Sequence, residues 1–389
     1  MRQNGVDAAQ LFGLILMSDG LPEQNSAPPR RVAVALSGGV DSAVVAVMLL
    51  KQGFDVFALT LHLCDGDDLE SAARVAQFLK IDHRIIDARQ PFRTLVMEPF
   101  AQSYRRGETP VPCALCNRFI KFGLLMEQAQ ELGAHALATG HYARSLEGVY
   151  GVELHKGIDP RKDQSYFLFG LSRDQLSFAR FPLGSKTKEE TRALAARYAL
   201  PVAERAESQD ICFVKEQDYV QVVRSLDPLQ VEQSGEIVDL AGKVLGQHQG
   251  ISHFTIGQRR GLNLGQRDGD RNEPLFVVAL DPAAARVIVG PHQALAQKEV
   301  FLRDVNWLGD SLPPQADHPL VLQARLRSTQ EPADAFFFAE MQEGRGHILL
   351  QEPVYGVAAG QAGVLYDGSR VLGGGWIDGA VLQGLPRQA

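Results

Sequence analysis

A glycine-rich turn between an apolar strand pattern and an apolar helix pattern constrains this chain more than any other feature. The turn has the sequence Ser37-Gly38-Gly39-Val40-Asp41-Ser42. Glycines let backbone N–H groups approach an anion, and the N-terminus of the following helix favours negative charge. Ser37 and Ser42 add hydroxyl donors, and Asp41 is suited to hold a magnesium ion between phosphate oxygens. The turn therefore predicts a nucleotide-phosphate site, the simpler alternative being a structural glycine turn before a helix.

Strand and helix patterns alternate through the first half of the chain. Predicted strands cover 31–36, 54–61, 83–87 and 134–139, and predicted helices cover 42–51, 69–79, 92–106 and 115–132. Such alternation indicates an α/β domain, in which a mostly parallel sheet is covered by helices on both faces.

The pattern changes after about residue 225. Runs 235–247 and 251–264 are rich in Gly and Gln, and short strand patterns such as 320–325 and 335–339 follow, with Asp367-Gly368 suited to a hairpin turn. We predict a small central β-rich module and then a C-terminal all-β barrel. The expected divisions are an N-terminal extension, a catalytic ATP-binding domain, a linking module and the barrel, at residues 1–28, 29–225, 226–297 and 298–385.

Composition restricts the cellular setting more than the function. No apolar stretch approaches the roughly 20 residues that span a bilayer. Four cysteines in 389 residues are too few for a disulfide scaffold and favour a reducing compartment, so we expect a cytoplasmic monomer without membrane contact. The net charge of -7 leaves room for an RNA partner held by a few basic patches.

Three of the cysteines stand in contexts that suggest chemistry. Cys113 and Cys116 follow Pro110 and Pro112, which predicts a loop leading into the next helix, where nearby cations lower a thiol pKa. Cys212 follows a polar run, whereas Cys64 is interpreted as structural. Taken singly, each is more often a small buried hydrophobe, and a zinc site would need a second cysteine pair that the sequence lacks.

The glycine-rich turn resembles the signature of the PP-loop ATP pyrophosphatases, which cleave ATP to AMP and pyrophosphate and adenylate a substrate oxygen. It lacks the Gly-Lys-Ser/Thr of an ordinary P-loop. Further motifs follow in order at 116–122, 139–144, 162–168, 208–213, 257–262 and 373–375. From about Arg31 onward, the chain resembles the bacterial tRNA-specific 2-thiouridylase family.

The resemblance implies that the substrate is the wobble uridine in the anticodon stem-loop of tRNAs for Lys, Glu and Gln, and that the product is 2-thiouridine. Cys212 matches the residue that carries a persulfide, and Cys116 matches the partner nucleophile that releases the product through a transient disulfide. The resemblance also implies a sulfur donor, such as a cysteine desulfurase or a sulfur relay protein.

Binding residues are carried over by the same motifs. The ATP contacts implied are Ala35, Leu36, Ser37, Gly38, Gly39, Val40, Asp41, Ser42, Leu61 and Gly140. The tRNA contacts implied are Lys162, Asp163, Gln164, Arg325 and Leu326. His141, within the 139–144 motif, is interpreted as a structural histidine rather than a base.

One departure from the family opens an alternative mechanism. The family's better-known form has Asn-Pro-Asp where this chain has Val111-Pro112-Cys113. Cys113, Cys116 and Cys212 are therefore also candidate ligands of an iron–sulfur cluster. Two other readings stay open: another PP-loop adenylating enzyme, such as an amidotransferase, and a tRNA-binding protein that has lost turnover.

Overall fold

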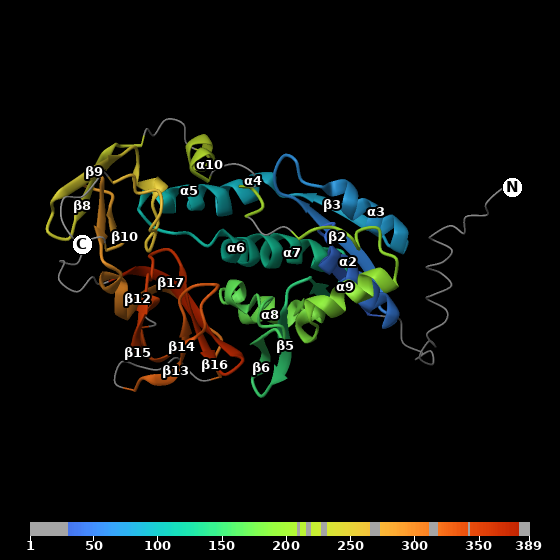
Figure 1. Ribbon diagram of the computed structural model, residues 1–389. Coiled ribbons are helices and arrows are strands. Elements are labelled where there is room, and N and C mark those ends of the chain that lie inside the picture. Colours follow the sequence, from blue (N-terminus) through green and yellow to red (C-terminus); the bar gives the residue numbers. More distant parts are fainter. Residues whose placement is uncertain are drawn as a thin grey trace. The chain divides into compact units, whose positions relative to one another are not determined.

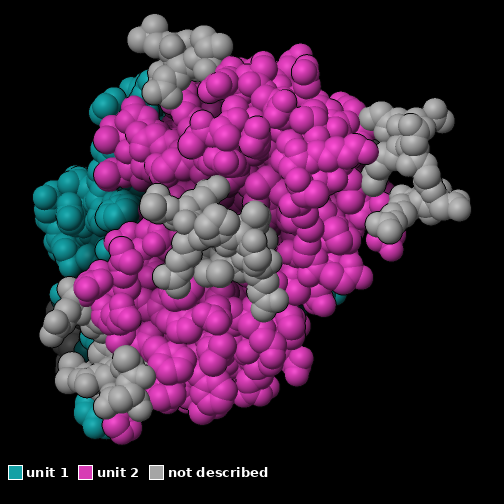
Figure 2. All heavy atoms as spheres, turned by 90° about the vertical axis from the view of Figure 1, so that its left-hand side faces the viewer, with its two compact units in different colours: residues 1–93, 116–209 teal, residues 94–115, 210–389 magenta. Residues whose placement is uncertain are grey.

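The computed structural model describes residues 30–207, 211–214, 219–226, 232–264, 273–310, 318–340 and 343–380. The expected extension 1–28 and part of the 208–213 motif lie outside these residues. The chain divides into two compact units, one formed by residues 1–93 with 116–209 and the other by residues 94–115 with 210–389 (Figure 2). Among the described residues, no helix is long and apolar enough to cross a membrane.

The first unit contains the predicted parallel sheet, with strand order β3-β2-β1-β4-β7 (Figure 1). The strands are β1 Arg31–Ala35, β2 Asp55–His62, β3 His83–Asp87, β4 Ala136–Ala138 and β7 Ala179–Arg180. Val32 and Val34 share a core cluster with residues of several helices, and Ala33, which faces the other side of the sheet, is also buried. Burial on both faces explains why these strands read as continuous apolar runs.

The predicted helices 42–51, 69–79 and 115–132 of the first unit are confirmed, whereas its helices after residue 164 were not predicted. The helices of this unit are α2 Val40–Lys51, α3 Leu69–Leu79, α4 Arg89–Phe92, π-helix η2 Cys116–Leu124, α7 Leu125–Glu131, 3₁₀ helix η3 Ser165–Leu168, α8 Arg173–Phe178, 3₁₀ helix η4 Pro182–Ser185 and α9 Lys188–Arg197. The hairpin β5 Ala143–Gly148 and β6 Gly151–Lys156 was not predicted.

The prediction that Cys113 and Cys116 lie on a loop before a helix is wrong. Helix α6, Pro112–Leu115, already contains Cys113, and Cys116 begins η2. Proline fits the first turn of a helix, where its missing N–H would have no intrahelical acceptor, so Pro112 starts this helix. The helix predicted over 92–106 is likewise divided, because a π-helical stretch η1, Arg93–Met97, separates α4 from α5, Glu98–Arg105.

The second unit contains a small sheet of strand order β10-β11-β8-β9, as expected for the central β-rich module. Its strands are β8 Gly235–Asp239, β9 Val244–His248, β10 Phe276–Asp281 and β11 Arg286–Gly290, with helix α10 Tyr219–Leu226 before them and 3₁₀ helices η5 Ile251–His253 and η6 His292–Leu295. Its core is a cluster of apolar side chains around Val277, Val287 and Val289.

The predicted barrel is confirmed by a sheet of order β12-β15-β14-β13-β16-β17 that closes where β12 pairs with β17. The strands are β12 Ala296–Trp307, β13 Leu320–Arg325, β14 Ala333–Glu340, β15 Arg345–Tyr355, β16 Ala362–Asp367 and β17 Arg370–Ala380. Burial alternates along β14, whose Phe337 lies fully inside. Gly368 adopts φ +56° at the predicted hairpin turn between β16 and β17.

Candidate nucleotide site

The predicted ATP contacts of the first unit gather at one edge of the parallel sheet. The turn 36–39 follows β1, Leu61 lies near the end of β2, and Gly140 lies just beyond β4. Because β1 pairs in parallel with both neighbours, the carboxyl ends of all three strands meet at this edge. The strand order also reverses at β1, since β2 lies on one side of it and β4 on the other. Open α/β sheets bind ligands at such a switch point.

The turn itself is built to present backbone N–H groups. Gly39 is the N-cap of α2 and no side chain caps the helix there, so the N–H groups of the first turn are open to an anion. Ser42 Oγ accepts a hydrogen bond from Ser37 N at 3.1 Å and lies 3.2 Å from Ser37 Oγ, which places both hydroxyls at the turn.

Two glycines of the site are required by close packing. Gly38 adopts φ +73°, and a Cβ there would lie 2.9 Å from the backbone nitrogen of Ala72 in α3. At Gly140, a Cβ would lie 3.1 Å from both Asp41 Cβ and Ser42 N. The turn is therefore pressed between the start of α3 and the end of β4, and larger side chains would displace it.

Arg205 contacts both the phosphate turn and the residue before α3. It donates to the Gly38 carbonyl at 3.0 Å and pairs with Asp68 at 2.7 Å. Asp68 is also the N-cap of α3, where its side chain accepts from Ser71 N and Ser71 Oγ, and these bonds lower its pKa. Arg205 therefore ties the phosphate turn to the N-terminus of α3. Sequence reasoning missed this residue, because nothing near position 205 resembles a nucleotide motif.

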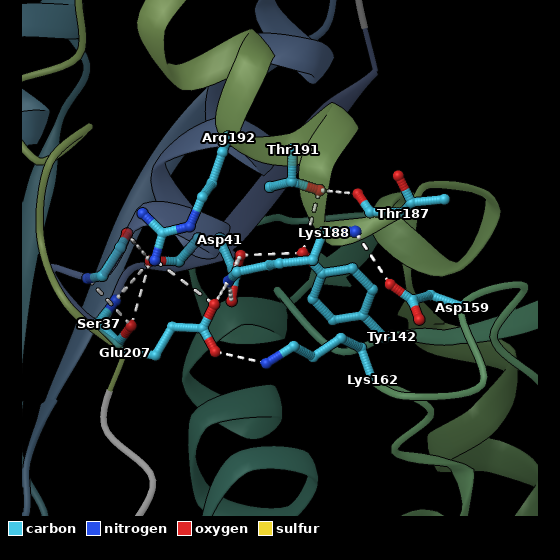
Figure 3. A network of polar contacts seen from close by, with 12 residues as sticks. Ser37, Asp41, Tyr142, Asp159, Lys162, Thr187, Lys188, Thr191, Arg192 and Glu207 are labelled. Carbon is cyan, nitrogen blue, oxygen red and sulfur yellow. Dashed lines mark hydrogen bonds and ion pairs between the residues drawn. The ribbon is translucent and has the colours of Figure 1, made fainter.

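Figure 3 shows a second set of charges, around Asp41. Lys188, the first residue of α9, places Nζ 2.7 and 2.9 Å from the two carboxylate oxygens of Asp41. The Tyr142 hydroxyl lies 3.0 Å from Asp41 Oδ1 and 3.0 Å from the Thr191 hydroxyl. Burial raises the pKa of Tyr142, which keeps this hydroxyl protonated.

Glu207 belongs to the same network of charges. Its carboxylate lies 2.5 Å from Lys162 Nζ, 3.0 Å from Lys188 Nζ and 3.5 Å from Arg192. The hydrogen bond from Lys162, followed by that from Lys188, lowers the pKa of Glu207 to about 2. The site thus holds three cations and two carboxylates from four separate segments of the chain.

The predicted tRNA contacts have well-defined partners within their own units. Lys162 pairs with Glu207, and Asp163 accepts hydrogen bonds from Gly157 N and Ser165 N, both at 3.1 Å. Gln164 Oε1 accepts from Tyr142 N at 3.0 Å. In the barrel, Arg325 ends β13 and donates to the Ser328 carbonyl, and Leu326 is fully buried. Their role as tRNA contacts stays a prediction.

The cysteines differ in exposure. Cys113 and Cys212 are exposed, Cys116 is buried, and Cys64 is intermediate, with its thiol 3.3 Å from Asp67 Oδ1. Within the described ranges, no group of three or more His, Cys, Asp or Glu side chains is arranged to hold a metal ion.

His141 fits the structural interpretation. Its Nδ1 lies 2.7 Å from Thr139 Oγ1 and its Nε2 lies 3.5 Å from Lys121 Nζ. The side chain is buried beside Phe122 and Phe181. Burial, followed by the charge of Lys121, holds the pKa of His141 well below its usual value, so the ring is neutral at pH 7.

The sheet, its switch point and the uncapped phosphate turn define a PP-loop nucleotide-binding protein. Three family models match the chain in sequence: the tRNA methyl transferase HUP domain at residues 30–216, the tRNA methyl transferase PRC-barrel domain at residues 226–291 and the Aminomethyltransferase beta-barrel domain at residues 297–377.

Similarity to curated relatives extends over most of the chain. The tRNA-specific 2-thiouridylase MnmA of Rhodospirillum centenum is 48% identical over 363 residues, which cover 89% of this chain and 91% of that protein. The MnmA of Paracoccus denitrificans is 50% identical over 363 residues, with the same coverage of 89% and 91%. The chain therefore belongs to the tRNA-specific 2-thiouridylase family.

Among solved structures, the U34-tRNA thiolase NcsA of Methanococcus maripaludis, with its [4Fe-4S] cluster, is 19% identical and has a TM-score of 0.33. The match covers 57% of this chain and 74% of that one. This likeness is too slight to support any argument about the cysteines.

Proposed function

We propose that this protein converts the wobble uridine of tRNA to 2-thiouridine at the expense of ATP. The proposal rests on two features that occur together in this member of the family. One is the uncapped phosphate turn, and the other is the pair Cys116 and Cys212 at the family's reactive positions. The substrates are tRNAs for Lys, Glu and Gln, bound through the anticodon stem-loop, and the products are 2-thiouridine, AMP and pyrophosphate.

The first step replaces a poor leaving group with a good one. The oxygen on carbon 2 of uracil attacks the α-phosphate of ATP, which forms an O–P bond and releases pyrophosphate. The first turn of α2, Ser37 and Ser42 bind the phosphates, because N–H and hydroxyl donors match phosphate oxygens. The donor set also fits magnesium, which Asp41 would hold and which would neutralise phosphate charge.

The second step transfers sulfur. The terminal sulfur of a Cys212 persulfide attacks carbon 2, and the C–O bond breaks so that AMP leaves with the uridine oxygen. Cys116 thiolate then attacks the Cys212 sulfur, which forms a Cys116–Cys212 disulfide and releases 2-thiouridine. An external thiol reduces the disulfide, and a cysteine desulfurase or sulfur relay protein rebuilds the persulfide, so a reducing cytoplasm suits the cycle.

The contacts with tRNA come from basic side chains in both units. Lys162, Asp163 and Gln164 in the first unit and Arg325 with Leu326 in the second are the proposed positions. Lysine and arginine there would bind phosphate and set the register of the anticodon arm, without reading its sequence.

The test is thiolation of an unmodified glutamate tRNA transcript with ATP, magnesium, cysteine and a cysteine desulfurase, with 2-thiouridine measured by mass spectrometry. We expect product with the wild type and none with Cys212→Ser, while Cys64→Ser serves as the matched cysteine control and retains activity. Absence of product with the wild type, despite bound tRNA and ATP, contradicts the proposal and favours a tRNA-binding protein that has lost turnover.

A parallel arm addresses the iron–sulfur alternative raised by Cys113. The persulfide route predicts that Cys113→Asp, which restores the family residue, retains thiolation in protein prepared without oxygen. Loss of activity in this variant, together with iron and charge-transfer absorption in the anaerobic wild type, supports a cluster held by Cys113, Cys116 and Cys212.

A further inference from the structure

The phosphate turn contains no basic residue. Residues 36–42 read Leu-Ser-Gly-Gly-Val-Asp-Ser, and their one charged side chain is the carboxylate of Asp41. An ordinary P-loop places a lysine inside the loop to reach the β and γ phosphates. A helix N-terminus contributes only about half of an elementary charge, which is far less than a polyphosphate carries. A cation from elsewhere in the chain would complete the site.

The fold brings Lys188 to this position from a segment 147 residues away. Its ammonium group lies between Asp41, at 2.7 Å from Oδ1, and Glu207, at 3.0 Å from Oε1. Only 9% of the Lys188 side chain is exposed. Lysine is rarely buried unless it is paired, and an ion pair in such surroundings interacts more strongly than one in water.

The geometry directs this buried charge at the phosphate turn. Asp41 lies in the first turn of α2, directly after the glycines. Lys188 itself begins α9, where Thr187 and Glu190 form a capping box that fixes the first residues of the helix. Lys188 N also donates to Asp159 at 3.1 Å, so the backbone of this residue is held on two sides.

We propose that Lys188 supplies the cationic contact to the β and γ phosphates of ATP that P-loop proteins take from a lysine within the loop. The inference rests on the ATP-dependent part of the proposed function. Lys188, Lys162 and Arg192 outnumber the carboxylates of Asp41 and Glu207 by one charge, so the cluster stays attractive to a polyanion. The ammonium carries three donors, which it directs at Asp41 Oδ1, Asp41 Oδ2 and Glu207. On binding, it would exchange one of these contacts for a phosphate oxygen and keep its place beside Asp41.

This role predicts different effects on the binding of the two ends of the nucleotide. Leu61 and Gly140 are the proposed neighbours of the adenosine, whereas Lys188 would contact only the phosphates that leave as pyrophosphate. Loss of Lys188 should therefore weaken binding of a triphosphate and spare binding of AMP. A lysine that merely holds the turn in shape would affect both ligands alike.

The experiment is calorimetric titration of the full chain with α,β-methylene ATP, in which the bond that the reaction cleaves is blocked, and with AMP, both with magnesium. For Lys188→Met, we expect the Kd for α,β-methylene ATP to rise about 10- to 100-fold, the range for loss of a charged hydrogen bond. The Kd for AMP should change less than about threefold. Lys188→Arg should recover part of the loss, and Lys186→Met, two residues earlier on the same segment, should change neither constant.

Equal losses for both ligands, or no loss for either, would overturn the role of Lys188. Thermal unfolding without nucleotide shows whether Lys188→Met is folded. If it is not, the Lys188→Arg variant decides the question. A change in Kd confined to α,β-methylene ATP supports the role, and an equal change in both Kd values contradicts it. A wild type that binds α,β-methylene ATP but forms no 2-thiouridine would refute the proposed function and leave this inference standing.

Discussion

The nucleotide site and the barrel achieve order in opposite ways. In the barrel, three of the strand pairs are hairpin neighbours, and the interior is filled with apolar side chains such as Phe337 and Ile348. The nucleotide site joins Asp41, Lys188 and Glu207 from distant segments through charged hydrogen bonds. Stability in the barrel should thus depend on volume, and function in the site on placement of charge.

The largest expected effect lies in the barrel core. Phe337→Ala removes a fully buried ring and should lower the free energy of unfolding by about 3–5 kcal/mol, because of lost burial and the cavity left behind. The chain has two tryptophans, Trp307 and Trp376, and both lie in barrel strands, so tryptophan fluorescence during urea unfolding reports this change. Binding of α,β-methylene ATP should be unchanged. A parallel loss of binding would show that the barrel core and the nucleotide site are not independent.

The next effect is expected in the phosphate turn. Gly38→Ala forces a side chain into φ +73° and against the Ala72 backbone, so we expect destabilisation of about 1–3 kcal/mol and loss of nucleotide binding. Gly53→Ala is the matched control, since Gly53 has φ +79° but a Cβ there meets nothing within 4 Å. Circular dichroism measures stability and calorimetry measures binding. Retained ATP affinity in Gly38→Ala would show that the turn does not bind phosphate.

A smaller effect is expected for Arg205, which bonds to the phosphate turn and to Asp68. Arg205→Ala removes the bonds to the Gly38 carbonyl and Asp68, and should raise the Kd for α,β-methylene ATP about 3- to 10-fold through poorer ordering of the turn. Arg84→Ala is a suitable control, because Arg84 is an exposed residue of β3. An unchanged Kd in Arg205→Ala would mean that the α3 cap alone holds the turn.

A further effect concerns pH. The pKa of His141 is lowered in the folded protein, so its contribution to stability is complete above the unfolded value of about 6.5 and declines as the pH falls below it. Each pH unit below 6.5 should cost up to about 1.4 kcal/mol until the folded pKa is reached. His141→Gln should show a shallower decline between pH 6.5 and 5 by urea unfolding. Identical slopes would indicate that His141 titrates normally.

Sequence predicted the two regions unequally well. The strand 320–325, the helix 69–79 and the Asp367-Gly368 turn were predicted closely, because strand alternation, helical periodicity and turn chemistry are local signals. The phosphate turn was also predicted as a site, since glycine, serine and aspartate stand together in the chain. Lys188, Glu207 and Arg205 were missed, because their role depends on which segments the fold brings together.

The helix at Pro112 shows a second limit. Two prolines before the cysteines suggested an end to regular structure, yet proline is as well suited to starting a helix as to preventing one. Position relative to the first turn decides between these outcomes, and single-sequence patterns rarely fix it within a few residues.

The most direct test follows the oxygen atom of the target uridine. A glutamate tRNA carrying ¹⁸O at carbon 2 of the wobble uracil is thiolated with unlabelled ATP, and the AMP released is analysed by mass spectrometry. The account predicts one ¹⁸O atom in each AMP formed per 2-thiouridine, because adenylation bonds this oxygen to phosphorus before sulfur replaces it. AMP without the label, formed alongside 2-thiouridine, would contradict activation of the uridine oxygen by ATP.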